Sequence, residues 1–200
     1  MTVSEPDESA AGRGSWRDWR VPLSAAQRTL REAYETLRPI GLDQRDVPLI
    51  VQLVEHPKYD MPGIDLFPGA VDLRTHDLIH IVLGRGLLLK DEAFVIGFTM
   101  GSTDRVGATE EAIYQFFARH VFPSGYRFGD EEVRVFKDAV RLGYVCDCRS
   151  LSEVNYDARL DWTLGRIRAE LGIEEDLLRA YYAIEKRRYP NSPESQRLLD

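Results

Sequence analysis

Two histidines of this chain, His76 and His80, are four residues apart, the spacing at which helical side chains lie one turn above each other. Their Cβ atoms would then be about 5–6 Å apart, so both imidazoles can reach one metal ion. Asp77 stands where the H-E-x-x-H motif of metalloproteases has its glutamate. Glu92 follows after a short glycine-containing turn. Together these side chains predict a metal site.

The turn should bring Glu92 back towards the histidines, because a short turn makes consecutive helices antiparallel neighbours. Two histidines and one carboxylate leave positions open on a zinc or iron ion, as a catalytic site requires. Asp77 can serve as a fourth ligand, as a general base on bound water, or as an acceptor for a histidine N–H. We therefore predict His76, Asp77, His80 and Glu92 as metal ligands, and Asp77 as the catalytic residue.

An alternative interpretation makes both histidines ordinary hydrogen-bonded residues of a packed helix. We favour the metal because four ligand-type side chains fall within seventeen residues, on a helix that is otherwise rich in apolar residues. Arg85 is a candidate for binding a substrate carboxylate, although a surface arginine needs no such role. Asp157 and Asp161 could add carboxylates to the site, but a solvated helix face explains them better.

The elements that must position these side chains are helices. Apolar spacing, capping residues and proline or glycine stops predict helices near 24–38, 47–55, 72–83, 91–101, 109–122, 131–142, 150–171 and 174–188. No segment alternates with the period of two that a strand requires. We expect an all-α, single-domain helical bundle over 16–190 that carries the metal, preceded by a disordered tail over 1–15 and followed by a polar C-terminal tail over 191–200.

Composition narrows the class of protein. A net charge of -7 argues against a nucleic-acid binder, which needs a basic face. No stretch approaches the roughly 20 apolar residues of a membrane span, and the first residues lack the apolar core of a signal peptide. Cys146 and Cys148 are too close in sequence for a good disulfide and are expected to be reduced and packed. We expect a cytoplasmic protein.

His76-Asp77-Leu78-Ile79-His80, then eleven residues and Glu92, resembles the signature of the Coq-four family of ubiquinone biosynthesis. A weaker resemblance runs over about 24–172. The chain departs from the family's pattern at Leu78 and Ile79, where the family usually carries aromatic residues. A divergent branch with another small ligand is therefore an alternative to a ubiquinone precursor.

The resemblance implies a helical fold, a metal held by His76, Asp77, His80 and Glu92, and a pocket for a quinone-like or isoprenoid lipid. It also implies a homodimer that works in a biosynthetic complex at a membrane surface, where the protein would be peripheral. The implied activity is oxidative decarboxylation of the aromatic head group of the substrate, which would make the protein a lyase or an oxidoreductase. Residues 93–100 could line the lipid pocket, although their composition favours plain core.

Two other functions compete with this one. An HD-type metal-dependent phosphohydrolase would use His56, the His76-Asp77 pair and a distant aspartate, for which Asp138, Asp147 and Asp157 are candidates. That reading gives Glu92 no role. The other is a non-catalytic lipid-binding scaffold in which the metal is structural.

Overall fold

A computed structural model describes residues 17–38, 71–103 and 127–199. In these ranges the chain folds into helices α1 (Leu30–Leu37), α3 (Leu73–Leu83), α4 (Leu89–Gly101), α6 (Asp130–Val145), α7 (Leu164–Leu171), α8 (Glu175–Arg188) and α9 (Pro193–Gln196), with 3-10 turns at Leu151–Glu153 and Asp157–Arg159. The described part contains no strand, which confirms the all-α prediction. None of its helices combines the length and the apolar character that a membrane crossing needs.

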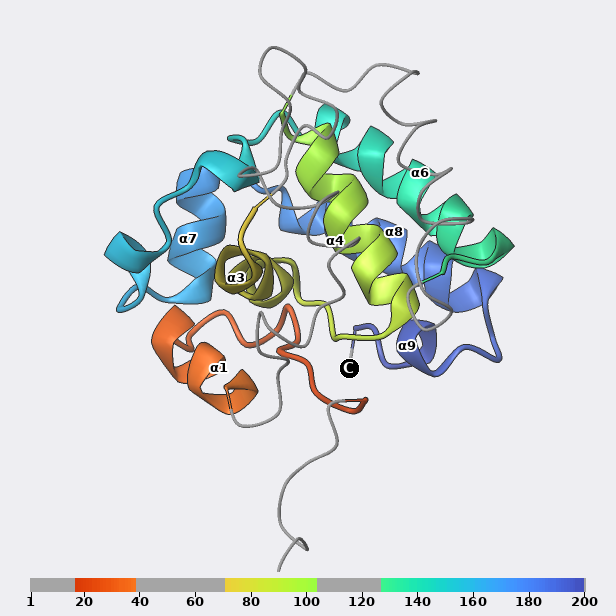
Figure 1. The fold of residues 1–200 in the computed structure, drawn as a ribbon, viewed down its shortest axis with the longest axis horizontal. Coiled ribbons are helices and arrows are strands. Elements are labelled where there is room, and N and C mark those ends of the chain that lie inside the picture. Colours follow the sequence, from red (N-terminus) through yellow and green to blue (C-terminus); the bar gives the residue numbers. More distant parts are fainter. Residues whose placement is uncertain (1–16, 39–70, 104–126, 200) are drawn as a thin grey trace, which may run out of the picture.

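Helices α4 and α6 form the most extensive contact, and they run side by side in Figure 1. Three glycines make this contact close. A Cβ atom on Gly97 or Gly101 would overlap the backbone carbonyl oxygens of α6, and one on Gly143 would overlap that of Phe98. The predicted helix end at Gly143 is therefore wrong: the helix continues to Val145, and this glycine serves the packing of two helices. Residues 93–100 are mostly buried, as the core interpretation predicted.

Helix α3 contacts both α1 and α7 and lies beside them in Figure 1. Its ends agree with the sequence. The Asp72 side chain accepts the N–H of Thr75 at the start, and Gly84 ends the helix with a left-handed φ of 74°. Gly172 closes α7 in the same way, with φ 75°.

Two predicted helix starts are wrong because tertiary hydrogen bonds replace the expected local ones. Helix α1 begins at Leu30 with the capping box of Thr29 and Glu32, and not near residue 24 as expected. The expected long helix over 150–171 is instead two 3-10 turns followed by α7. The carbonyl oxygens of Leu160 and Trp162 accept the N–H groups of Arg31 and Leu30, so an uninterrupted helix cannot use them.

Several sequence predictions fall on residues that the structure does not describe. These are the tail over 1–15, the helices over 47–55 and 109–122, and His56. Within the segment assigned to a polar tail, residues 193–196 form α9 and Leu198 is buried. Cys146 and Cys148 are free thiols and buried, in agreement with packed cysteines.

Candidate metal centre

Helices α3 and α4 bring the predicted ligands together through the turn between them. His76 and His80 lie one turn apart on α3, and Glu92 lies in the first turn of α4. The two helices are not the antiparallel neighbours expected from the sequence, because Figure 1 shows α3 nearly end-on and α4 lengthwise. Glu92 nevertheless faces both rings, since it follows the turn so closely that the direction of the rest of α4 does not matter.

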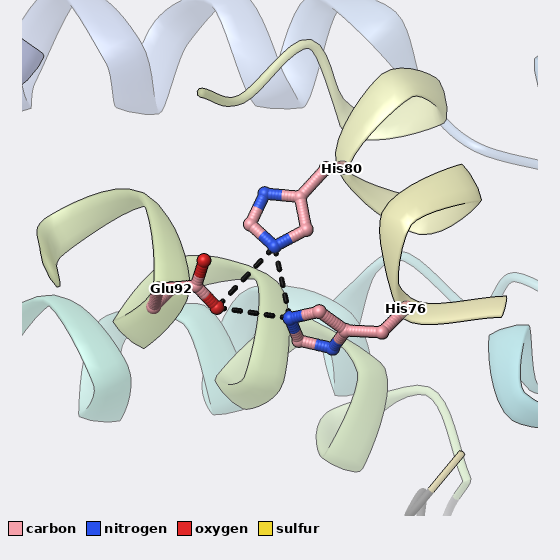
Figure 2. Close-up of side chains that lie close together, drawn as sticks. All are labelled: His76, His80 and Glu92. Carbon is pink, nitrogen blue, oxygen red and sulfur yellow. Dashed lines mark hydrogen bonds and ion pairs between the residues drawn. The ribbon is translucent and has the colours of Figure 1, made fainter. Parts of the chain in front are cut away.

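Three atoms converge at this point: Nε2 of His76, Nε2 of His80 and Oε2 of Glu92 (Figure 2). We call them the ligand triad. His76 Nε2 lies 2.9 Å from Glu92 Oε2 and 2.9 Å from His80 Nε2. The third separation, from His80 Nε2 to Glu92 Oε2, is 3.4 Å. This group can hold a metal ion, as the sequence predicted.

The separations fit the bond lengths of a small transition-metal ion. Atoms at 2.9, 2.9 and 3.4 Å from one another lie on a circle with a radius of about 1.8 Å. A point about 1 Å above their plane is then about 2.0–2.1 Å from all three, the usual Zn–N and Zn–O distance. A four-coordinate ion held at that point would have one further position, on the side away from the three atoms, for water or substrate.

The backbone of the turn fixes the tautomer of one ligand. Nδ1 of His80 lies 2.6 Å from the carbonyl oxygen of Gly86. A carbonyl oxygen only accepts hydrogen bonds, so Nδ1 carries a proton, and Nε2 is the nitrogen that can offer a lone pair to the triad. Histidine ligands of metals are commonly oriented in this way. No residue type predicts this contact, because its acceptor is a backbone carbonyl group.

The triad is buried on one side and accessible on the other. The His80 side chain is fully buried, whereas those of His76 and Glu92 are 16% and 28% exposed. Burial raises the pKa of Glu92, but the imidazoles of His80 and His76 outweigh it and hold that pKa well below its usual range. Glu92 is therefore a carboxylate, the form that binds a cation.

Asp77 lies beside the triad but is not a member of it. The metal-ligand group comprises His76, His80 and Glu92, so the structure does not bring Asp77 into the predicted ligand set. Burial, opposed by the two histidines, raises the pKa of Asp77 to about 6. Its carboxyl group is thus close enough to interact electrostatically with the site while remaining outside the converging atoms.

Arg85 is not where a substrate-binding residue would lie. Its side chain is fully buried and forms two bonds with the Glu185 carboxylate, at 3.1 and 2.5 Å. The guanidinium also stacks on Phe94 and Tyr182, at 4.0 and 4.4 Å from their ring centroids. The predicted role in binding a carboxylate is therefore not supported, because Glu185 already occupies this cation inside the core.

Three further candidate carboxylates lie in ion pairs. Asp157 bonds Arg74 at 2.6 Å, and Asp161 bonds Arg31 at 2.7 Å. Both aspartates are largely exposed, as expected of a solvated face. Asp138, a candidate ligand in the phosphohydrolase reading, bonds Arg188 at 2.6 Å. Glu92, which that reading leaves idle, instead meets both histidines.

Comparison of the chain with family models, curated proteins and solved structures finds no match. The geometry of the triad is therefore the evidence for metal chemistry in this chain.

Proposed function

We propose that this chain is a metal-dependent enzyme that binds one divalent zinc or iron ion through His76, His80 and Glu92. The observation that carries the proposal is the convergence of three lone-pair atoms within 3.4 Å of one another. Without a cation, only shared protons can relieve the crowding of these atoms. A divalent ion satisfies all three at once, and this is the arrangement found in open sites with two histidines and one carboxylate.

The partial exposure of His76 and Glu92 supports a catalytic rather than a structural ion. A structural zinc normally has four protein ligands, whereas the described part of the chain offers three. When bound, the ion would supply a positive centre that polarises a substrate oxygen or, if it is iron, an electron-transfer centre. Asp77 would move a proton to or from the group at the open position.

The substrate class that we propose is a carboxylated aromatic ring, with a quinone-like or isoprenoid character implied by the resemblance to the Coq-four family. Since Arg85 is paired with Glu185, the substrate carboxylate would be neutralised at the open metal position instead.

In simple decarboxylation the ring–carboxyl bond breaks, carbon dioxide leaves, and the ring carbon keeps the electron pair and takes one proton. The oxidative form replaces the carboxyl group by hydroxyl, and it consumes dioxygen and a two-electron reductant. A homodimer in a complex at a membrane surface belongs to the same proposal.

An open position can be tested with cobalt-substituted protein. We expect benzoate to change the visible absorption of bound Co²⁺, because a carboxylate can replace water at the fourth position. A lipid-binding scaffold with a closed structural site would show no change. His80→Ala is the matched control and should give no cobalt spectrum in either condition.

Activity is tested by measuring carbon dioxide release from a prenylated hydroxybenzoate in the presence of dioxygen and a reductant. We expect release with zinc- or iron-loaded protein and none with His80→Ala. Metal binding without release from any carboxylated aromatic substrate would reject the enzyme and leave the scaffold.

A further inference from the structure

The segment from Ser192 to Leu198 packs against the turn that carries the metal ligands, although it is about one hundred residues away in sequence. Gly86, whose carbonyl orients His80, is in direct contact with this segment. A Cβ atom on Gly86 would overlap the guanidinium of Arg197 and the carbonyl oxygen of Trp19. Arg197 therefore covers one side of the turn between α3 and α4 at Gly86.

Arg197 also holds the start of α4. One of its terminal nitrogens bonds the Asp91 carboxylate, and the other donates to the carbonyl oxygen of Arg17 at 2.5 Å. Asp91 is fully buried and accepts the N–H of Leu88 at 3.2 Å, as the side-chain cap of the first turn of α4. The next residue is Glu92. Arg197 therefore contacts the residue that directly precedes the proposed metal ligand Glu92.

The same segment is anchored at the other end of the turn. Ser195 Oγ donates to Glu185 at 3.0 Å, and Glu185 bonds Arg85, which lies next to Gly86. Gln196 donates from its amide to the carbonyl oxygen of Lys186 at 2.6 Å. Before Gly86, the segment is thus linked to Arg85 through Glu185. After Gly86, it is linked to α4 through the contact of Arg197 with Asp91.

We infer that Arg197 is a positioning residue for the metal centre, which holds the Gly86 carbonyl and the first turn of α4 so that His80 and Glu92 converge. This inference rests on the proposed function, since it requires that the triad bind an ion. The triad atoms come from two helices that are joined by this turn. Movement of the turn separates Glu92 from the histidines and releases Nδ1 of His80 from its acceptor.

The coupling must be reciprocal. If Arg197 improves the affinity for a metal, a bound metal stabilises the packing of the segment that contains Arg197 by the same factor. The backbone N–H groups of Gln196, Arg197 and Leu198 donate within this segment, at 2.9, 3.2 and 3.3 Å. Their hydrogen exchange reports the packing without any substitution.

The test compares Co²⁺ affinity and the visible Co²⁺ spectrum of the full chain with those of Arg197→Ala, Arg197→Lys and Arg188→Ala. The last variant removes an arginine–aspartate pair that joins α8 to α6. We expect Arg197→Ala to bind Co²⁺ about 10–100-fold more weakly with an altered spectrum, as is typical when a ligand loses its support. Arg197→Lys should recover part of the affinity, and Arg188→Ala should match the unsubstituted protein.

Unchanged affinity and spectrum in Arg197→Ala would overturn the inference while leaving the metal site intact. Failure of the unsubstituted protein to bind Co²⁺ or Zn²⁺ would instead overturn the proposed function and, with it, the inference. If Arg197→Ala does not fold, hydrogen exchange of the unsubstituted protein decides. Zn²⁺ is expected to slow exchange at residues 196–198, and equal rates with and without Zn²⁺ would contradict the coupling.

Discussion

Two groups of polar side chains lie on either side of the turn between α3 and α4, and they differ in how their charges are satisfied. One is the ligand triad. The other, which we call the ion-pair network, consists of Arg85, Asp91, Glu185 and Arg197. In the network each cation faces an anion: Arg85 bonds Glu185 at 2.5 Å and lies 3.6 Å from Asp91. In the triad three potential acceptors face one another.

The two groups differ in what their polar side chains meet: opposite charges in the ion-pair network, and other lone-pair atoms in the triad. In the ion-pair network oppositely charged groups meet in the core and hold distant segments together. Arg85 Nε, Asp91 Oδ1 and Arg197 Nε form no hydrogen bond with the described residues, so the network is held by its ion pairs. The triad brings three lone-pair atoms together, and the separations of these atoms match the bond lengths of a metal ion. Residue types alone do not distinguish the two cases, since Arg85 and Glu92 are both charged residues near the same turn.

The largest effect is expected from breaking the network. Glu185→Ala leaves Arg85 buried without its principal partner, and we expect it to lower the free energy of unfolding of the metal-free protein by about 3–5 kcal/mol. Urea unfolding measures this loss. Arg188→Ala, in a partly exposed ion pair, should cost under about 1 kcal/mol. Equal losses in the two variants would mean that the network is no more important than a surface pair.

Metal binding at the triad should stabilise the folded protein. Free Zn²⁺ at about 100 times its dissociation constant is expected to raise the free energy of unfolding by about 2.7 kcal/mol. The gain should disappear on chelation and should shrink as the pH falls, because imidazole ligands bind metal only when unprotonated. Thermal unfolding with and without Zn²⁺ measures it. An equal gain in His80→Ala would place the stabilising ion elsewhere.

The Asp77→Asn variant distinguishes the role of the triad in metal binding from the proposed role of Asp77 in proton transfer. Because Asp77 lies outside the metal-ligand group, we expect this variant to fold, to keep its metal and to lose less than about tenfold in affinity, the lower limit typical for supporting residues. Carbon dioxide release should nevertheless be lost if Asp77 moves the proton. A much larger loss of affinity would make Asp77 a ligand after all, and unchanged affinity with unchanged activity would remove it from the site.

The smallest effect is expected at the surface. The pair of Arg74 and Asp157 is largely exposed, so Asp157→Asn should change the free energy of unfolding by no more than about 1 kcal/mol. Zn²⁺ affinity should remain unchanged, because Asp157 is paired with Arg74 and is not a member of the triad. Isothermal titration calorimetry provides the comparison. A clear drop in affinity would return Asp157 to the list of carboxylates near the ion.

The sequence predicts best what depends on local spacing. His76 and His80 follow the period of a helix, and Glu92 follows a short turn, so their convergence requires little knowledge of the rest of the chain. The ends of α3 at Asp72 and Gly84 were predictable for the same reason.

What the sequence does not predict depends on contacts between distant residues. The burial of Arg85 is invisible without Glu185, which is one hundred residues away. The 3-10 turns before α7 arise from hydrogen bonds with the start of α1. Gly143 carries the signature of a helix end but serves the contact of α6 with α4. In each case a tertiary interaction outweighs a correct local signal.

The most direct test of the account is the metal content of protein purified without chelator, compared with that of the His76→Ala, His80→Ala double variant. We expect about one divalent ion per chain in the unsubstituted protein and none in the double variant, whose remaining carboxylate cannot hold an ion alone. Circular dichroism should show that both remain helical. Full metal content in the folded double variant would contradict the central claim that His76, His80 and Glu92 form a metal centre.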